Sequence, residues 1–289
     1  MAVDLHVHST ASDGTVPPGE LPALAAECHL SALALTDHDT VAGVTQFLTR
    51  RAEFPELELI AGVELSSRYA AREIHLVGLF LDCNHPELAE FLESMRRERR
   101  RRADLLCERL AALHYPLSEE DLRLAGAADT PGRPHFARAL VNRYHFSGNL
   151  EVFERLLKRG APAYVPRLLP DPGEALRAIK AAGGVAVWAH PIRNHAGEGA
   201  FARRVLERLI PLGLDGVEAY YTDFTPWQTA CMLELAADFH LAVSGGSDFH
   251  GANHPHVDIG SGRGDLSVPD ETLIRLKKAR EPKLVIVNR

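Results

Sequence analysis

Val3-Asp4-Leu5-His6-Val7-His8 opens the chain as a short apolar strand with two histidines at its end. Side chains two residues apart on a strand point to the same face, so His6 and His8 can share one ligand. A buried histidine hydrogen-bonded to the backbone is the ordinary alternative for such a pair. The residues at the ends of the other strands therefore decide whether His6 and His8 are interpreted as ligand-binding or as buried structural residues.

Short apolar runs alternate with helical patterns along the rest of the chain. The expected strands are 3–8, 32–36, 57–65, 74–80, 185–189, 216–219 and 241–244. The expected barrel helices are 18–29, 41–54, 172–182, 198–212, 226–240 and 269–279. This alternation is typical of βα units with a parallel sheet. Between the third and fourth strands, a hairpin through 67–72 would set Glu64 and His75 near each other. It predicts an α/β fold, a distorted (β/α)7 barrel with its active site at the carboxyl ends of the strands.

Residues 85–170 interrupt this pattern with helices alone. A long helix is expected over 86–114, followed by helices around 134–144 and 150–159 and a proline-rich return over 161–172. The domain prediction is therefore a barrel formed by residues 1–84 and 171–289, with a helical cap inserted at 85–170.

Side chains that bind metals stand at or beside the ends of the expected strands. They are His6, His8, Asp13, His38, Glu64, His75, His190, Asp248 and His250. No single ion can use nine ligands, so the set predicts a cluster of two or three divalent metals. Asp37 is expected to orient an imidazole. Individual alternatives remain open, such as an Asx-turn at Asp13 or a helix N-cap at Asp39.

The composition limits the kinds of partner that the protein is expected to bind. The formal net charge of −7 gives no general positive field, which argues against binding to a DNA duplex. The 4 cysteines are scattered without a C-x-x-C pair, and no stretch approaches the ~20 apolar residues of a membrane span. With no secretory leader pattern at the start, a cytoplasmic protein without a membrane partner is expected.

Four short motifs resemble those of the polymerase and histidinol phosphatase (PHP) family of metal-dependent phosphoesterases. They are Asp4-Leu5-His6-Val7-His8-Ser9, Thr36-Asp37-His38, Ala189-His190-Pro191 and Gly246-Ser247-Asp248-Phe249-His250. Glu64 and His75 fall where the family places a bridging carboxylate and another ligand. The resemblance covers nearly the whole chain. It implies a PHP-type barrel and a phosphoric ester hydrolase, with Mn(II) favoured over Zn(II) or Fe(II).

Within the family, Gly132-Arg133-Pro134-His135-Phe136 and Pro162-Ala163-Tyr164-Val165-Pro166 resemble one subgroup. That subgroup contains 3′,5′-nucleotide bisphosphate phosphatases and enzymes that trim short RNAs from the 5′ end. The resemblance implies a first ion at His6, His8, Glu64 and Asp248, a second at Glu64, His75 and His190, and a third at Asp13, His38 and His250.

The favoured function is removal of the 3′-phosphate from 3′-phosphoadenosine 5′-phosphate (pAp), which yields AMP and phosphate. A hydroxide bridging two ions would attack phosphorus, and Asp248 would orient it as well as bind metal. A 5′–3′ exonuclease on short RNA shares this chemistry and remains an alternative. Two further classes stay open, a C–N hydrolase of the amidohydrolase type and a non-catalytic metal-binding domain.

Three residues are candidates for holding a substrate phosphate away from the metals. Arg133 can grip a phosphate through two hydrogen bonds, His135 lies two residues further on, and Arg193 follows the His190-Pro191 pair. Surface salt bridges are the alternative for both arginines. The basic run at 96–102 wraps a whole helical circumference, so a solvated helix paired with acids is favoured there over an RNA-guiding ledge.

Overall fold

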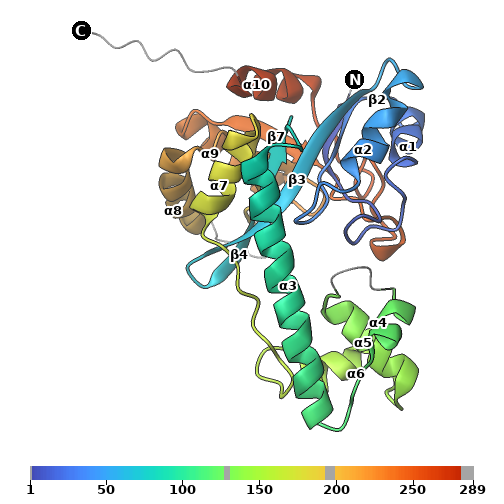
Figure 1. The fold of residues 1–289 in the computed structure, drawn as a ribbon. Helices are drawn as coiled ribbons and strands as arrows, with labels where there is room; N and C mark the ends of the chain where they lie inside the picture. The colour runs from blue at the N-terminus through green and yellow to red at the C-terminus, as the bar shows by residue number, and fades with distance from the viewer. Residues whose placement is uncertain (1, 127–130, 193–198, 281–289) are drawn as a thin grey trace. The chain divides into compact units, whose positions relative to one another are not determined.

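The computed structural model describes residues 2–126, 131–192 and 199–280. The chain divides into two compact units, one formed by residues 1–91 and 170–289 and the other by residues 92–169. The first unit holds a sheet and the helices around it, and the second is built from helices alone (Figure 1).

The first unit is organised around one seven-stranded sheet in the order β1-β2-β3-β4-β5-β6-β7. Its strands are β1 (Ala2–Val7), β2 (Leu30–Leu35), β3 (Glu58–Tyr69), β4 (Arg72–Leu79), β5 (Val185–Ala189), β6 (Gly216–Tyr221) and β7 (Ala242–Gly246). The sheet curls until its last strand returns to its first. Two backbone hydrogen bonds show this closure, from the His8 N–H to the Phe249 carbonyl oxygen and from the Asp248 N–H to the His6 carbonyl oxygen. The expected α/β barrel of seven strands is confirmed.

The sheet is parallel except at one strand, where the hairpin expected through 67–72 is confirmed. β4 pairs antiparallel with β3 and with β5, while the other neighbouring strands pair parallel. Only Ala70 and Ala71 separate β3 from β4. A two-residue connection can join antiparallel strands, whereas parallel neighbours need a long crossover. The amino end of β4 therefore lies at the rim where the parallel strands end.

Helices cover the sheet in the first unit. They are α1 (Leu21–Glu27), α2 (Val44–Leu48), η1 (Thr49–Ala52), α7 (Pro172–Ala181), α8 (Gly199–Leu209), η3 (Ile210–Leu212), α9 (Pro226–Asp238), η4 (Gly251–Asn253) and α10 (Asp270–Arg280). Alternate side chains of β2 enter different cores: Ala32 and Ala34 join a cluster with α10, whereas Leu33 and Leu35 pack with α1 and α2. This division follows from the two-residue period of a strand.

The second unit has a separate core. Its helices are α3 (Pro86–Ala112, whose first six residues belong to the first unit), α4 (Glu119–Leu124), α5 (Arg133–Arg143), α6 (Asn149–Val152) and the π-helical segment η2 (Phe153–Leu157). Leu106, Leu110, Phe136 and Leu140 are almost completely buried in one cluster. The sequence did not lead us to expect α4, which Ser118 begins through a capping box with Asp121.

Among the described residues, no helix has the length and apolar character needed to cross a membrane.

Candidate metal centre

The expected ligands gather at one rim of the barrel. His6 is the second-last residue of β1 and His8 directly follows that strand. Glu64 lies on β3, and His75 lies near the amino end of β4. His38, His190, Asp248 and His250 follow β2, β5 and β7, and Asp13 lies in the loop after β1. The antiparallel direction of β4 is essential here, because it pairs His75 with Ala189 and so brings it beside His190.

Glu64 lies at the centre of the cluster and is completely buried. Its Oε1 is 2.8 Å from His75 Nδ1 and 3.0 Å from His190 Nε2. Its Oε2 is 2.8 Å from His38 Nδ1, 3.3 Å from His8 Nε2 and 3.4 Å from His6 Nε2. One carboxylate thus reaches five imidazoles from four segments of the chain, as a carboxylate bridging several ions would.

Asp248 approaches the same cluster from the end of β7. Its Oδ1 is 3.2 Å from His8 Nε2 and 3.5 Å from His6 Nε2. The Asp248 backbone has a φ of 56°, an uncommon left-handed conformation for a residue with a side chain. A Cβ atom at Gly246 would lie 2.4 Å from the His6 Cβ, so a glycine is required for β7 to come this close to β1.

Asp13 forms the more open edge of the cluster. Its side chain is 56% exposed, with Oδ1 3.2 Å from His250 Nε2 and Oδ2 3.8 Å from His38 Nε2. The His8 and His250 rings stack with their centroids 4.1 Å apart. Asp13 thus lies beside three imidazoles, since its Oδ1 is also 3.8 Å from His8 Nδ1, and an Asx-turn alone does not account for this position.

The pKa values of the cluster reflect shared charge in a buried space. Burial lowers the pKa of His8, but hydrogen bonds to Asp248 and Glu64 raise it to about 9. Burial likewise lowers the pKa of His75, but the Glu64 charge raises it to about 10. In return, burial raises the pKa of Glu64, and the His38 charge and other imidazoles hold it well below its usual range. Protons on imidazoles thus balance the carboxylates, and a divalent cation can take their place.

Two buried atoms test whether metals fit these residues. His8 Nδ1 and Glu64 Oε2 make no well-aligned hydrogen bond among the described residues, although Glu64 Oε2 lies 2.8 Å from His38 Nδ1. An unpartnered buried polar atom costs about 1–3 kcal/mol, which coordination of a cation would offset. Four groups have ligand atoms close enough to hold an ion: His8, Asp13, His38 and His250; His6, His8 and Asp248; His6, Glu64 and His190; and His38, Glu64 and His75. The cluster can therefore bind metal, and its nitrogen and oxygen donors suit Mn(II), Fe(II) or Zn(II).

These four groups overlap, so the distances alone do not divide the ligands between ions. His6, His8, His38 and Glu64 each belong to two groups. The three-ion assignment implied by the family resemblance stays a prediction.

Two neighbouring acids have roles other than those considered from the sequence. Asp37 accepts hydrogen bonds from the Ser9 N–H and hydroxyl and from the Ser12 hydroxyl, so it braces the loop after β1. Asp39 accepts from the Ser66 N–H at 2.9 Å and lies five residues before α2, so it ties the end of β2 to β3 and does not cap the helix.

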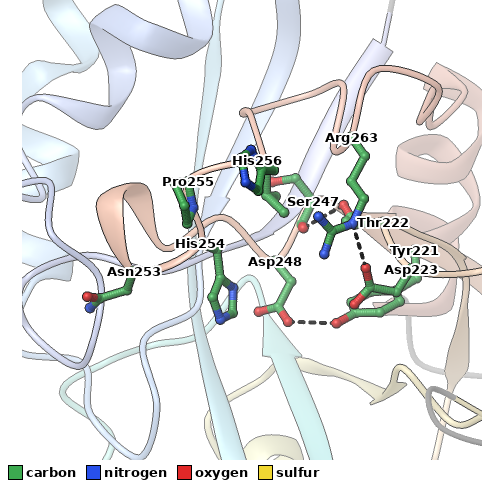
Figure 2. Close-up of a pocket in the computed structure, with 11 residues that line it drawn as sticks. Tyr221, Thr222, Asp223, Ser247, Asp248, Asn253, His254, Pro255, His256 and Arg263 are labelled. Carbon is green, nitrogen blue, oxygen red and sulfur yellow. Dashed lines mark hydrogen bonds and ion pairs between the residues drawn. The ribbon is translucent and has the colours of Figure 1, made fainter. Parts of the chain in front are cut away.

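Sequence reasoning missed Glu218 and Tyr221 of β6. Glu218 Oε1 is 3.1 Å from His6 Nδ1, and the Tyr221 hydroxyl donates to Asp248 Oδ2 at 2.9 Å. The available signal was a carboxylate inside the apolar strand 216–221, because a buried charge needs a partner. Figure 2 shows Tyr221 directed at Asp248. A cavity of about 190 Å³ opens here and is lined by residues that include Ser247, Asp248, Asn253, His254 and Arg263.

Two of the three candidate phosphate-binding residues belong to the second unit. Arg133 and His135 belong to the first turn of α5 in the second unit. His135 Nδ1 accepts the Gly132 N–H at 3.0 Å, which holds this imidazole at the start of the helix. Arg193 lies outside the described residues.

Known proteins resemble this chain over most of its length. The PHP domain family matches residues 4–150. A 5′–3′ exoribonuclease from Haemophilus influenzae is 36% identical over 247 residues, covering 86% of this chain and 89% of that protein. A 3′,5′-nucleoside bisphosphate phosphatase from Chromobacterium violaceum is 34% identical over 264 residues, covering 89% of this chain and 90% of that protein.

A solved structure extends the likeness to the fold. A crystal structure from Bifidobacterium adolescentis, described as a metal-dependent phosphoesterase, superposes with a TM-score of 0.78 at 30% identity. The match covers 98% of this chain and 97% of that one.

Proposed function

We propose a reaction for this protein from the premise that the chain belongs to the PHP domain family. It is a phosphoric ester hydrolase, as its relatives are phosphatases and nucleases. The observation that carries the proposal is the position of Glu64, which lies within 3.4 Å of five imidazole nitrogens. This arrangement fits a cluster of two or three divalent ions, for which we propose Mn(II).

The proposed substrate is a 5′-phosphorylated nucleotide that carries a second phosphate on its 3′-oxygen, with pAp favoured. The Chromobacterium relative, named for a 3′,5′-nucleoside bisphosphate, supports this choice. Water adds to phosphorus, the bond from phosphorus to the 3′-oxygen breaks, and the 3′-oxygen takes a proton. The products are AMP and inorganic phosphate.

A short RNA with a 5′-phosphate is the second candidate, favoured by the identity to the Haemophilus exoribonuclease. Release of the first nucleotide as a 5′-monophosphate breaks the same bond between phosphorus and a 3′-oxygen. The two substrates differ in whether a further nucleoside is attached to the reacting phosphate.

Different residues have different proposed roles in the reaction. Divalent ions, when bound, lower the pKa of water toward about 7 and neutralise the charge on phosphate. The nine clustered side chains would hold those ions, with Glu64 at the centre of the set. Asp248 accepts a hydrogen bond from the attacking water and orients it toward phosphorus. Arg133, His135 and Arg193 are proposed to hold the phosphate that does not react, because a guanidinium can donate two parallel hydrogen bonds to phosphate.

The direct experiment compares two substrates on one metal-loaded preparation. Phosphate release from pAp and mononucleotide release from a 5′-phosphorylated trinucleotide are measured as kcat/KM with Mn(II). A higher value for pAp supports the phosphatase, and a higher value for the trinucleotide makes the exonuclease the main activity. Hydrolysis of neither, in protein shown to contain metal, would contradict the proposed reaction. The Asp248→Ala variant is the control, because it should lose nearly all turnover on both substrates.

A further inference from the structure

β6 supplies none of the expected ligands, yet two of its buried side chains touch the ligands of other strands. Glu218 is 2% exposed and Tyr221 is 3% exposed. Glu218 reaches His6 and the backbone of His190, and Tyr221 reaches Asp248. We infer that β6 is a positioning strand, in which Glu218 and Tyr221 hold the proposed ligands in the orientation that metal binding requires.

The two oxygens of Glu218 determine which nitrogen of His6 carries the proton. Glu218 Oε2 accepts the backbone N–H of His190 at 2.7 Å. Glu218 Oε1 lies 3.1 Å from His6 Nδ1. A carboxylate only accepts hydrogen bonds, so His6 donates from Nδ1. A neutral His6 therefore has its lone pair on Nε2.

That nitrogen points into the cluster. His6 Nε2 lies 3.1 Å from His8 Nε2, 3.4 Å from Glu64 Oε2 and 3.5 Å from Asp248 Oδ1. An imidazole binds a metal only through a nitrogen that lacks a proton. A carboxylate on the opposite nitrogen fixes the tautomer and the ring orientation, as is common behind metal-bound histidines.

Tyr221 acts on Asp248 in the same way. Its hydroxyl donates to Asp248 Oδ2 at 2.9 Å, while Asp248 Oδ1 faces His8 at 3.2 Å. The hydrogen bond thus holds one carboxylate oxygen while the other faces His8, and so fixes the carboxylate plane. Thr222, directly after β6, also donates to the Ser247 carbonyl oxygen at 2.7 Å and ties the two strand ends together (Figure 2).

Glu218→Gln tests the tautomer directly, because both neighbours of the carboxylate are donors. A glutamine has one oxygen, so its NH2 group must face either the His190 N–H or His6 Nδ1. In the first case a buried N–H loses its acceptor, and in the second the His6 proton moves to Nε2 and blocks coordination. We expect Mn(II) binding, measured by competition with a chelator, to weaken by roughly 10- to 100-fold. The visible spectrum of the Co(II)-loaded variant should also differ from that of the unaltered protein.

Asp215→Asn is the matched control. Asp215 directly precedes β6, and its Oδ2 accepts the Ala186 N–H of β5 at 2.9 Å and pairs with Lys180 at 2.6 Å. It therefore joins β5 to β6 through a backbone N–H as Glu218 does, but in the described part of the chain its carboxylate contacts no imidazole. The variant should lower the melting temperature of the metal-free protein and leave the Mn(II) affinity and the Co(II) spectrum unchanged. Equal losses of affinity in both variants would show that Glu218 acts only through stability, and would overturn the inference.

Tyr221→Phe keeps the ring and removes only the hydroxyl, so it tests the second contact if Glu218→Gln fails to fold. We expect weaker Mn(II) binding than in the unaltered protein, but a smaller loss than for Glu218→Gln. Unchanged Mn(II) affinity in Tyr221→Phe and Glu218→Gln would overturn the inference. It rests only on the metal-binding part of the proposed function, since affinity is read without turnover. An unaltered protein that binds no Mn(II) or Co(II) would overturn both, whereas metal binding without hydrolysis would leave β6 as a positioning strand.

Discussion

The two compact units of this chain place their charges in opposite ways. In the barrel unit, Glu64 is completely buried. Burial raises its pKa, but the imidazoles around it hold that pKa well below its usual range. In the helical unit, the Arg101 guanidinium lies 2.9 Å from the Glu98 carboxylate one turn earlier, and Arg123 lies 2.6 Å from Glu120 in the same way. Both regions are rich in charge along the sequence. Burial and convergence from distant segments, and not charge density, distinguish the candidate site from a solvated helix surface.

The largest expected effect comes from the centre of the buried cluster. Glu64→Gln keeps the size of the side chain but removes the charge that five imidazoles face. We expect kcat/KM for pAp to fall by roughly a thousandfold, because a group that stabilises transition-state charge in a dry site costs about 10²–10³ when lost. Metal content by elemental analysis should fall with it. Near-normal turnover with a full complement of metal would remove Glu64 from the centre of the proposed site.

The second prediction concerns pH. His8 and His75 have pKa values raised to about 9 and about 10, above the usual value near 6.5. In metal-free protein their protonated forms add stability that is fully present below about pH 6.5 and is lost as pH rises through 9 to 10. Because a cation displaces these protons, Mn(II) affinity should rise at least about tenfold per pH unit between pH 6 and 8.

Calorimetric titration in buffers of different ionisation enthalpy measures this linkage through the protons released on binding. We expect release of at least one proton per protein at pH 7. Mn(II) binding at pH 7 without proton release would contradict the pKa shifts.

A smaller effect is expected in the helical unit. It would show that one charged residue of this unit binds substrate, whereas others form exposed ion pairs. Arg133→Ala should raise KM for pAp by at least about tenfold, since the loss of even one of its two hydrogen bonds to a charged phosphate costs that much. The change should be much smaller for a nucleotide carrying one phosphate. Arg101→Ala is the control in the same unit, because Arg101 is already paired with Glu98. Equal KM increases on both substrates would mean that Arg133 does not recognise the second phosphate.

The smallest effect should come from the exposed ion pairs themselves. Arg101→Ala is expected to change the melting temperature by less than about 2 °C, since an exposed pair one helical turn apart contributes little to stability. The comparison of thermal unfolding curves with and without added salt measures this. A larger loss of stability would show that the Arg101–Glu98 pair contributes more than a solvated surface contact.

Much of the fold follows from local patterns. The period of two in β2 separates Ala32 and Ala34 from Leu33 and Leu35, and the structure places these pairs in different cores. The α4 helix was not predicted from the sequence because it has only six residues, although Ser118 and Asp121 form a recognisable capping box. The direction of β4 also followed from the sequence, because a connection as short as the hairpin expected through 67–72 can join only antiparallel strands.

The candidate site was likewise predictable from the sequence only in part. His6 and His8 could be paired from sequence because neighbours two apart share a face of a strand. Asp37 was expected beside an imidazole, but its hydrogen bonds go to Ser9 and Ser12 instead. No local pattern separates these outcomes, because both place an acid after a strand end.

The sequence by itself determined which residue types stand at each strand end, and therefore that imidazoles and carboxylates would meet at one rim. Only the tertiary structure decided that Glu64 lies at the centre and that Glu218 stands behind His6, 212 positions earlier in the chain. The physical reason is that strand periodicity is a local property, whereas the distance between two side chains depends on the curvature and closure of the whole sheet.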